Sequence, residues 1–196
     1  MIVPGIAASA NGSVDPSLIS IGLGALAGNA VIPAFTDVPL VGESAYPIYI
    51  FSHGDTSLPQ WYSHYLGSIA ADGNIVVAIT HRDGSNAGSQ VIIKGQEGAR
   101  NITYLTPDML IPRVNATGLA MLERKFRQAE VEEVVIVLQK INDGQGEGVY
   151  QNNSRGDGER LGDWKGRLDL TKLVVGGHSF GATSAVSSKA SNCQPR

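Results

Sequence analysis

Short apolar runs, separated by longer segments with helical periodicity, dominate the pattern of hydrophobic and polar positions along this chain. Residues 46–52, 74–80 and 173–175 are apolar runs of strand length, and most are rich in β-branched side chains. Because these runs contain few polar alternate positions, they are typical of strands buried on both faces of a sheet. The pattern therefore predicts three buried strands.

Helical spacing occurs between and after these strands. Residues 59–72 begin with a proline, carry apolar side chains on one face and end in Asp-Gly, which predicts a helix. Apolar residues recur every three or four positions through 113–142 and predict a long helix. The β-branched residues of 131–138 favour a strand, but two glutamates and the sustained periodicity favour the helix. The small residues of 182–190 can form a further helix.

Two segments show no regular period. Residues 87–112 are expected to form an irregular surface excursion, and the Gly-, Asn- and Asp-rich residues 143–167 a long loop. The remaining elements alternate between strand and helix, which predicts an α/β fold with a mostly parallel sheet and helices on both faces. We expect one domain in residues 1–196, with residues 1–45 as an N-terminal extension.

Charge and cysteine content exclude several classes of partner. The net charge is −3, which argues against binding to nucleic acid or to a polybasic-dependent membrane site. No Lys or Arg precedes Arg82, so a signal peptide with a basic start is not visible. Cys193 is the only cysteine, so an internal disulfide is excluded and the redox compartment stays open.

Four N-glycosylation sequons, more than chance predicts from the composition, favour secretion; they begin at Asn11, Asn101, Asn115 and Asn152. The alternative is a cytoplasmic protein in which these asparagines serve only as turn residues.

The N-terminal extension contains a mostly apolar segment, residues 18–32. It is a candidate amphipathic helix for peripheral contact with a lipid surface, and the simpler interpretation is ordinary core-facing structure. Residues 22–27 also match the G-x-G-x-x-A pattern of dinucleotide sites. Pro33 would end the required helix too early, so that hypothesis is the weakest.

The candidate chemistry lies at the end of the last strand, where Gly177, His178, Ser179, Phe180 and Gly181 form a G-x-S-x-G sequence. In a tight turn from strand to helix, this pattern is a nucleophile elbow: the serine adopts a strained conformation and the glycines let neighbouring backbones approach. The turn raises the Ser179 hydroxyl above the sheet. It also aims the Phe180 N–H at the place where an oxyanion would form.

A second half of an oxyanion hole is predicted after the first strand. That strand runs into His53-Gly54-Asp55, and the Asp55 N–H is the candidate donor. His53 itself is expected to be structural rather than a proton carrier. After the second strand, Arg82 and Asp83 are expected to brace the loop by a charge-assisted pair. The same His-Arg-Asp sequence opens a kinase catalytic loop, but the asparagine that should follow is absent.

The motifs at 47–54, 71–78, 81–83 and 177–181, in this order and spacing, resemble the plasma and type II platelet-activating factor acetylhydrolases and their microbial relatives. The resemblance covers residues 32–184, the N-terminal portion of that family. It implies an α/β-hydrolase that removes a short or oxidised acyl chain from the sn-2 position of a phospholipid, without a metal or other cofactor. In the family a helix before the His-Gly strand touches lipid surfaces.

By this resemblance, Ser179 matches the nucleophile and Asp55 and Phe180 the oxyanion-hole amides. Two residues depart from the family pattern, because Thr56 and Ala182 stand where glycines are expected. The first departure bears on the shape of the oxyanion loop. The second is tolerated if the helix packs slightly farther from the sheet.

Two rival functions remain from the sequence: a general esterase or lipase of the same fold, and a non-catalytic, vestigial protein that keeps the elbow as a turn. In this fold the triad acid and base follow the serine, yet residues 180–196 contain no Asp, Glu or His. We therefore expect an incomplete domain that lacks the acid and base. Residues 1–196 alone should be poorly soluble, with an apolar sheet edge at 173–176, and have negligible esterase activity.

Overall fold

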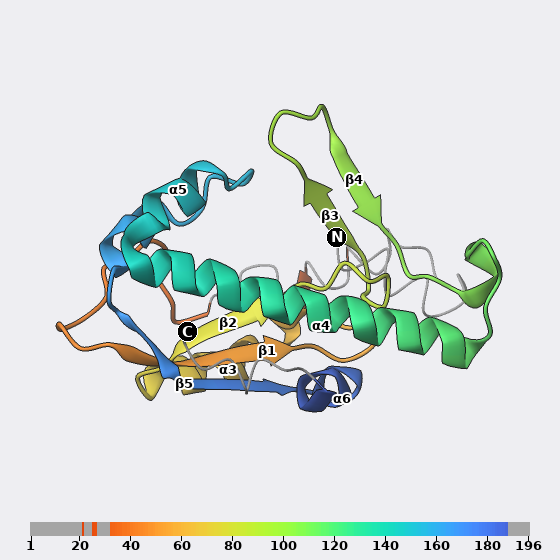
Figure 1. Cartoon of the computed structure of the whole chain (residues 1–196), viewed down its shortest axis with the longest axis horizontal. Helices are drawn as coiled ribbons and strands as arrows, with labels where there is room; N and C mark the ends of the chain where they lie inside the picture. The colour runs from red at the N-terminus through yellow and green to blue at the C-terminus, as the bar shows by residue number, and fades with distance from the viewer. Residues whose placement is uncertain (1–20, 22–24, 27–31, 188–196) are drawn as a thin grey trace.

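The computed structural model describes residues 21, 25–26 and 32–187 (Figure 1). Three parallel strands form the central sheet, in the order β2-β1-β5. The predicted alternation of strands and helices and the α/β class are confirmed. The elements that build it are β1 (Tyr46–Ser52), α3 (Ser63–Ala71), β2 (Ile75–Ile79), α4 (Ala116–Lys140), β5 (Leu168–Gly177) and α6 (Phe180–Ser187).

The strand β1 lies in the middle, and its side chains alternate between two cores. Ile48 and Ile50 are 1% and 0% exposed and pack with Val131 and Leu138 of α4. Phe51 faces the other side, where its ring centroid lies 4.7 Å from that of Tyr62. Burying an aliphatic side chain such as Ile48 or Ile50 contributes about 1.5–3 kcal/mol to the free energy of unfolding. Helices therefore cover both faces of the sheet, with α4 in front and α3 behind in Figure 1.

The register brings the carboxyl ends of the three strands to one edge. Ser52 pairs with Ile79 of β2 on one side and with Gly177 of β5 on the other. The chain leaves β1 toward β2 and later returns on the opposite side of β1 as β5. In open parallel sheets, ligands bind at the carboxyl edge where the strand order reverses in this way.

The long helix α4 forms as the periodicity predicts, and the strand alternative for 131–138 is wrong. Its N-cap is Asn115, whose side-chain oxygen accepts a hydrogen bond from the Gly118 N–H at 2.8 Å. The apolar stripe through Val131 and Leu138 packs against the sheet, so its burial outweighs the local β propensity. The predicted helix at 59–72 is also present, as a 3₁₀ turn, η1 (Pro59–Tyr62), followed by α3.

The expectation of an irregular segment at 87–112 is wrong. It contains an antiparallel hairpin, β3 (Ser89–Ile92) and β4 (Ala99–Ile102), and a 3₁₀ turn, η2 (Pro107–Met109). Gly95 and Gly98 have positive φ angles of 82° and 77°, which close the connection between the strands. Figure 1 shows this hairpin projecting from the domain.

The long loop expected at 143–167 is also wrong. A π turn, η3 (Ile141–Gln145), continues α4, and α5 (Gly146–Gln151) and a 3₁₀ helix, η4 (Glu159–Trp164), follow. A Cβ atom on Gly146 would lie 1.8 Å from the carbonyl oxygen of Leu161. The glycine therefore serves close packing of α5 on η4 rather than a flexible loop.

Most of the candidate lipid-binding segment, 18–32, and residues 188–190 of the last predicted helix lie outside the described residues. Within the described part, β5 pairs with β1 alone, and Val174 on β5 is 57% exposed. The open apolar edge expected at 173–176 is present there. In that same part of the chain, no helix has the length and apolar character needed to cross a bilayer.

Candidate active site

The G-x-S-x-G sequence forms the sharp turn between β5 and α6. Ser179 has a φ angle of 53°, in the left-handed region that a non-glycine residue rarely adopts, and its side chain is exposed. Such strain persists only where the surrounding structure enforces it, and it concentrates at functional sites. The structure therefore has the backbone geometry that the elbow pattern predicts.

Two glycines make room for the turn against the end of β1. A Cβ atom on Gly177 would lie 2.6 Å from the carbonyl oxygen of Ser52, and one on Gly181 would lie 2.1 Å from the same oxygen. The N–H of His178 donates to that oxygen at 3.1 Å. The elbow is thus held directly on the last residue of β1.

This contact brings the two predicted oxyanion segments together. A Cβ atom on Gly54 would lie 3.4 Å from the Cβ of Ser179, so the loop after β1 touches the elbow. Phe180 is the first residue of α6, where backbone N–H groups have no partner within the helix. Among the described residues, the N–H groups of Asp55 and Phe180 donate to no other group. Both are therefore available to an acceptor.

Thr56 shows how the loop keeps its shape without the expected glycine. Its φ angle is 52°, again in the left-handed region, although a β-branched residue is unfavourable there. Its N–H donates to the carbonyl oxygen of Ser85 at 2.7 Å. The backbone conformation that a glycine would favour is retained, and threonine bears the strain.

His53 is buried, and each of its ring nitrogens makes a hydrogen bond. Nε2 accepts a hydrogen bond from the His81 N–H at 3.3 Å, so Nδ1 carries the proton and donates to the Gly54 carbonyl at 2.7 Å. Burial lowers the pKa of His53 from 6.5 to about 4, so the ring is neutral near pH 7. These contacts support the structural role predicted for it.

A buried Ser-His-Glu relay lies behind the elbow. Nδ1 of His81 is 2.7 Å from Oε2 of Glu130, and Nε2 is 2.7 Å from Oγ of Ser52. In the tautomer whose Nδ1–H donates to the carboxylate, Nε2 accepts a hydrogen bond from the Ser52 hydroxyl. Ser52 and His81 are both 0% exposed. A substrate cannot reach them, so this relay fixes the end of β1 rather than activating a nucleophile.

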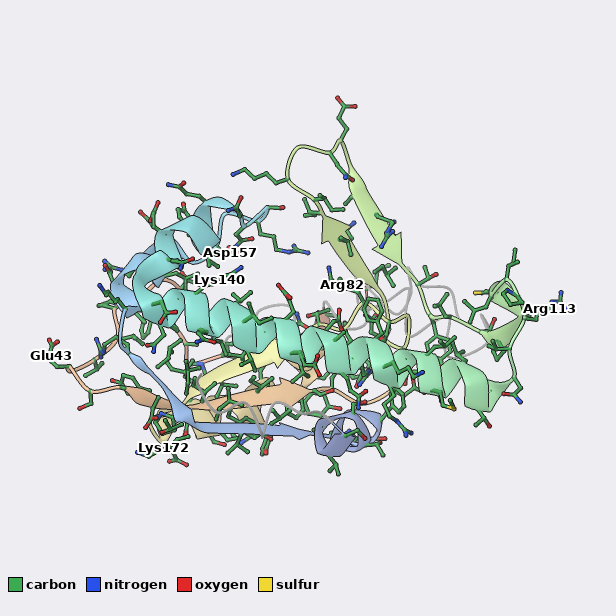
Figure 2. All side chains as sticks on the ribbon, in the orientation of Figure 1. Glu43, Arg82, Arg113, Lys140, Asp157 and Lys172 are labelled. Carbon is green, nitrogen blue, oxygen red and sulfur yellow. The ribbon has the colours of Figure 1, made fainter. Side chains whose placement is uncertain are left out.

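The expected pair between Arg82 and Asp83 is wrong, because each residue is paired with α4 instead. Nε of Arg82 lies 3.0 Å from Oε1 of Glu130, and Nε of Arg127 lies 2.7 Å from Oδ2 of Asp83. Burial opposes ionisation of Asp83, but Arg127 and hydrogen bonds from Ser85 outweigh it and lower the pKa of this carboxyl group. Figure 2 shows Arg82 between α4 and the hairpin.

Sequence reasoning missed Arg127 and Glu130. Both lie on the stripe of α4 that also carries Val131 and Leu138, and Arg127 is 0% exposed. A signal was present, since charged residues three apart on the apolar face of a helix must find buried partners. The partners come from the loops after β1 and β2, so only the tertiary structure identifies them.

None of the four histidines makes a hydrogen bond to Ser179. His53 and His81 are committed to the buried contacts described above, and Nδ1 of His178 is 2.9 Å from the Tyr62 hydroxyl. His64 lies exposed on α3. The described residues thus place an exposed serine in a strained turn beside two unbonded amides, and none of their histidines is hydrogen-bonded to that serine.

A small acidic cluster lies beside the oxyanion loop. The Tyr104 hydroxyl donates to Oδ2 of Asp55 at 3.3 Å. Burial and the charges of Asp83 and Asp55 raise the pKa of Glu123 from 4.5 to about 7. The carboxyl group of Glu123 is therefore partly protonated near neutral pH.

A parallel sheet covered on both faces, with a strained serine in the turn between a strand and a helix at its carboxyl edge, defines the α/β-hydrolase class. The chain matches the family model described as "Platelet-activating factor acetylhydrolase, isoform II" over residues 5–196. The chain belongs to this family, which confirms the resemblance drawn from the motifs.

Individual relatives agree with the family match. The chain is 30% identical over 167 residues to "Platelet-activating factor acetylhydrolase" of Cavia porcellus, covering 82% of this chain and 36% of the relative. It is 30% identical over 151 residues to "Putative phospholipase A2" of Schizosaccharomyces pombe, covering 70% of this chain and 33% of that protein. The chain thus spans about a third of the length of these curated relatives.

Proposed function

We propose that this chain carries the nucleophile and oxyanion hole of a serine carboxylic-ester hydrolase acting on phospholipids. The preferred reaction is cleavage of a short or oxidised sn-2 acyl chain, as in 1-alkyl-2-acetylglycerophosphocholine esterase. The observation that carries the proposal is the exposed Ser179 with its φ angle of 53°, held on β1 by two glycines. Membership of the acetylhydrolase family supports the substrate class.

In this mechanism, Ser179 Oγ attacks the ester carbonyl carbon and its proton passes to a base. The N–H groups of Asp55 and Phe180 hold the resulting oxyanion, which collapses to an acyl-enzyme as the alcohol leaves. Water then attacks the acyl-enzyme and releases the acid. Because no histidine of these 196 residues makes a hydrogen bond to Ser179, we propose that they lack the activating base and acid by themselves. A triad deprived of its members retains only about 10³–10⁴-fold acceleration over water.

The direct test compares ester hydrolysis by residues 1–196 and by the natural full-length protein. The full-length protein should release acetate from a 2-acetyl phospholipid, and the Ser179→Ala variant should not. The 196-residue chain should show negligible turnover. Fast, Ser179-dependent hydrolysis by the 196-residue chain would refute the proposal that these residues lack an activating base.

Two alternatives have their own outcomes. A general esterase or lipase would cleave an aryl acetate in preference to the 2-acetyl phospholipid of equal acyl length. A vestigial protein would fold yet leave Ser179 unlabelled by a fluorophosphonate in the full-length chain.

We also propose that the N-terminal segment 18–32 contacts the lipid surface that presents the substrate. The described residues in and just after this segment are apolar and exposed, among them Leu26 at 88% and Phe35 at 87%. Co-sedimentation with phosphatidylcholine vesicles should fall when Leu26 and Phe35 are both changed to Ser. Unchanged sedimentation would refute the contact.

A further inference from the structure

We propose that Arg127 is the positioning residue that aligns the two halves of the oxyanion hole. The inference rests on the proposed ester hydrolysis and extends it to a residue on α4, a helix far in sequence from both donor segments. Arg127 itself does not touch the substrate, since its side chain is 0% exposed.

The guanidinium group holds the loop after β1 through the backbone. Its Nη1 donates to the carbonyl oxygen of His53 at 2.5 Å, two residues before the Asp55 N–H. The same nitrogen lies 3.4 Å from Oγ of Ser52. A charge-assisted hydrogen bond to a buried carbonyl fixes the position of the peptide at which the loop leaves the sheet.

The same guanidinium group also contacts the elbow, through the aromatic ring of Phe180. Its central carbon lies 4.7 Å from the ring centroid of Phe180, the residue that carries the second candidate N–H. One planar group therefore contacts both donor-bearing segments. A shift of Arg127 would change the distance between the two N–H groups, which must both point to one oxygen.

Arg127 is fixed in turn by the loop after β2. Its Nε donates to Oδ2 of Asp83 at 2.7 Å, and its Nη2 donates to Oγ of Ser85 at 2.5 Å. The Ser85 hydroxyl donates to the other Asp83 oxygen at 2.7 Å. A lysine has no planar fork of donors and could not make these contacts together.

The kinetic test uses the full-length natural protein with Arg127→Lys and the double variant Arg127→Met with Asp83→Asn. The double variant leaves no unpaired buried charge, which protects the fold. We expect kcat on a 2-acetyl phospholipid to fall about 10–100-fold in both, with KM within about twofold, because misplaced donors affect the transition state more than binding. Arg124→Lys is the matched control on the same helix, since Nε of Arg124 has no hydrogen-bond partner among the described residues, and it should retain the wild-type kcat.

Hydrogen exchange gives a readout that does not depend on activity. In the double variant, the hydrogen-bonded amides of Thr56, Gly181 and Ala182 should exchange faster together, while those of α3 stay unchanged. Wild-type kcat in Arg127→Lys, or a loss confined to KM, would overturn the positioning role. If the wild-type protein proves inactive, only the proposed function is refuted. The positioning role of Arg127 is refuted separately if hydrogen exchange in the double variant stays slow in either the loop after β1 or the elbow.

Discussion

Replacing Gly181 by alanine should separate the elbow from the end of β1. The added Cβ would lie 2.1 Å from the carbonyl oxygen of Ser52 and 2.5 Å from that of His53, and real Cβ contacts essentially never fall below 3.0 Å. Both neighbours are backbone atoms, so no side chain can rotate away. The helix or the strand end must move instead.

The expected loss of stability in Gly181→Ala follows from the contacts that a shift of α6 or of the end of β1 would disturb. Overpacking typically costs about 1–3 kcal/mol. The two carbonyl oxygens also accept hydrogen bonds, from the His178 N–H at 3.1 Å and from Arg127 at 2.5 Å. Weakening them adds on the order of 1 kcal/mol, and the helix preference of alanine returns about as much. The last two terms cancel, so we expect a net loss of about 1–3 kcal/mol in the free energy of unfolding.

The assay is urea denaturation of the wild-type protein and the variant, followed by circular dichroism. Gly67→Ala is the matched control: Gly67 lies in α3, and a Cβ there meets nothing within 4 Å. This variant should gain about 0.5–1 kcal/mol. If Gly181→Ala is as stable as Gly67→Ala, the close contact between elbow and strand is refuted.

Three further predictions concern the loop after β1 and its surroundings. The pKa of His53 is about 4 in the folded protein and 6.5 in the unfolded chain. The contribution of this residue to the free energy of unfolding is therefore fully present above pH 6.5, and about 3 kcal/mol is lost as pH falls toward 4. Urea titrations at pH 7 and 4.5 should show this loss, and His53→Asn should flatten it. Because the pKa of Glu123 is raised to about 7, the stability from its protonated form is present below pH 4.5 and lost as pH rises through 7. Glu123→Gln should therefore stabilise the fold more at pH 8 than at pH 5, and equal effects would contradict the shift. Thr56→Gly should relieve left-handed strain and leave the free energy of unfolding, measured by urea titration, unchanged or raised by up to about 1 kcal/mol, whereas a clear loss would show that threonine is favoured there.

The sequence was informative wherever a local pattern determined the structure. Strand-length apolar runs gave β1, β2 and β5, and the glycine spacing around Ser179 gave the elbow, because each depends on residues close together in the chain. The hairpin and α5 were missed, since their glycines close a turn and permit close packing, and both roles depend on the partner segment.

The network around the site was missed for a different reason. Arg127 and Glu130 contact residues 42 or more positions away, and no local pattern encodes such pairs. The pairing of Arg82 with Asp83 was expected from adjacency, but each side chain pairs with a residue of α4 instead. Charged residues on the buried stripe of α4 were the available sign of a polar network beneath the sheet edge.

The measurement that tests the central claim most directly is identification of the residue modified by a fluorophosphonate in the full-length natural protein. Both Ser179 and the buried Ser52 have features of a nucleophile, the first its exposed strained turn and the second its hydrogen bond to His81. Peptide fragmentation by mass spectrometry separates them, since they lie on different peptides. We predict a single phosphonyl adduct at Ser179 and none at Ser52. An adduct at Ser52, or an unlabelled protein that still hydrolyses the 2-acetyl phospholipid, would contradict the account.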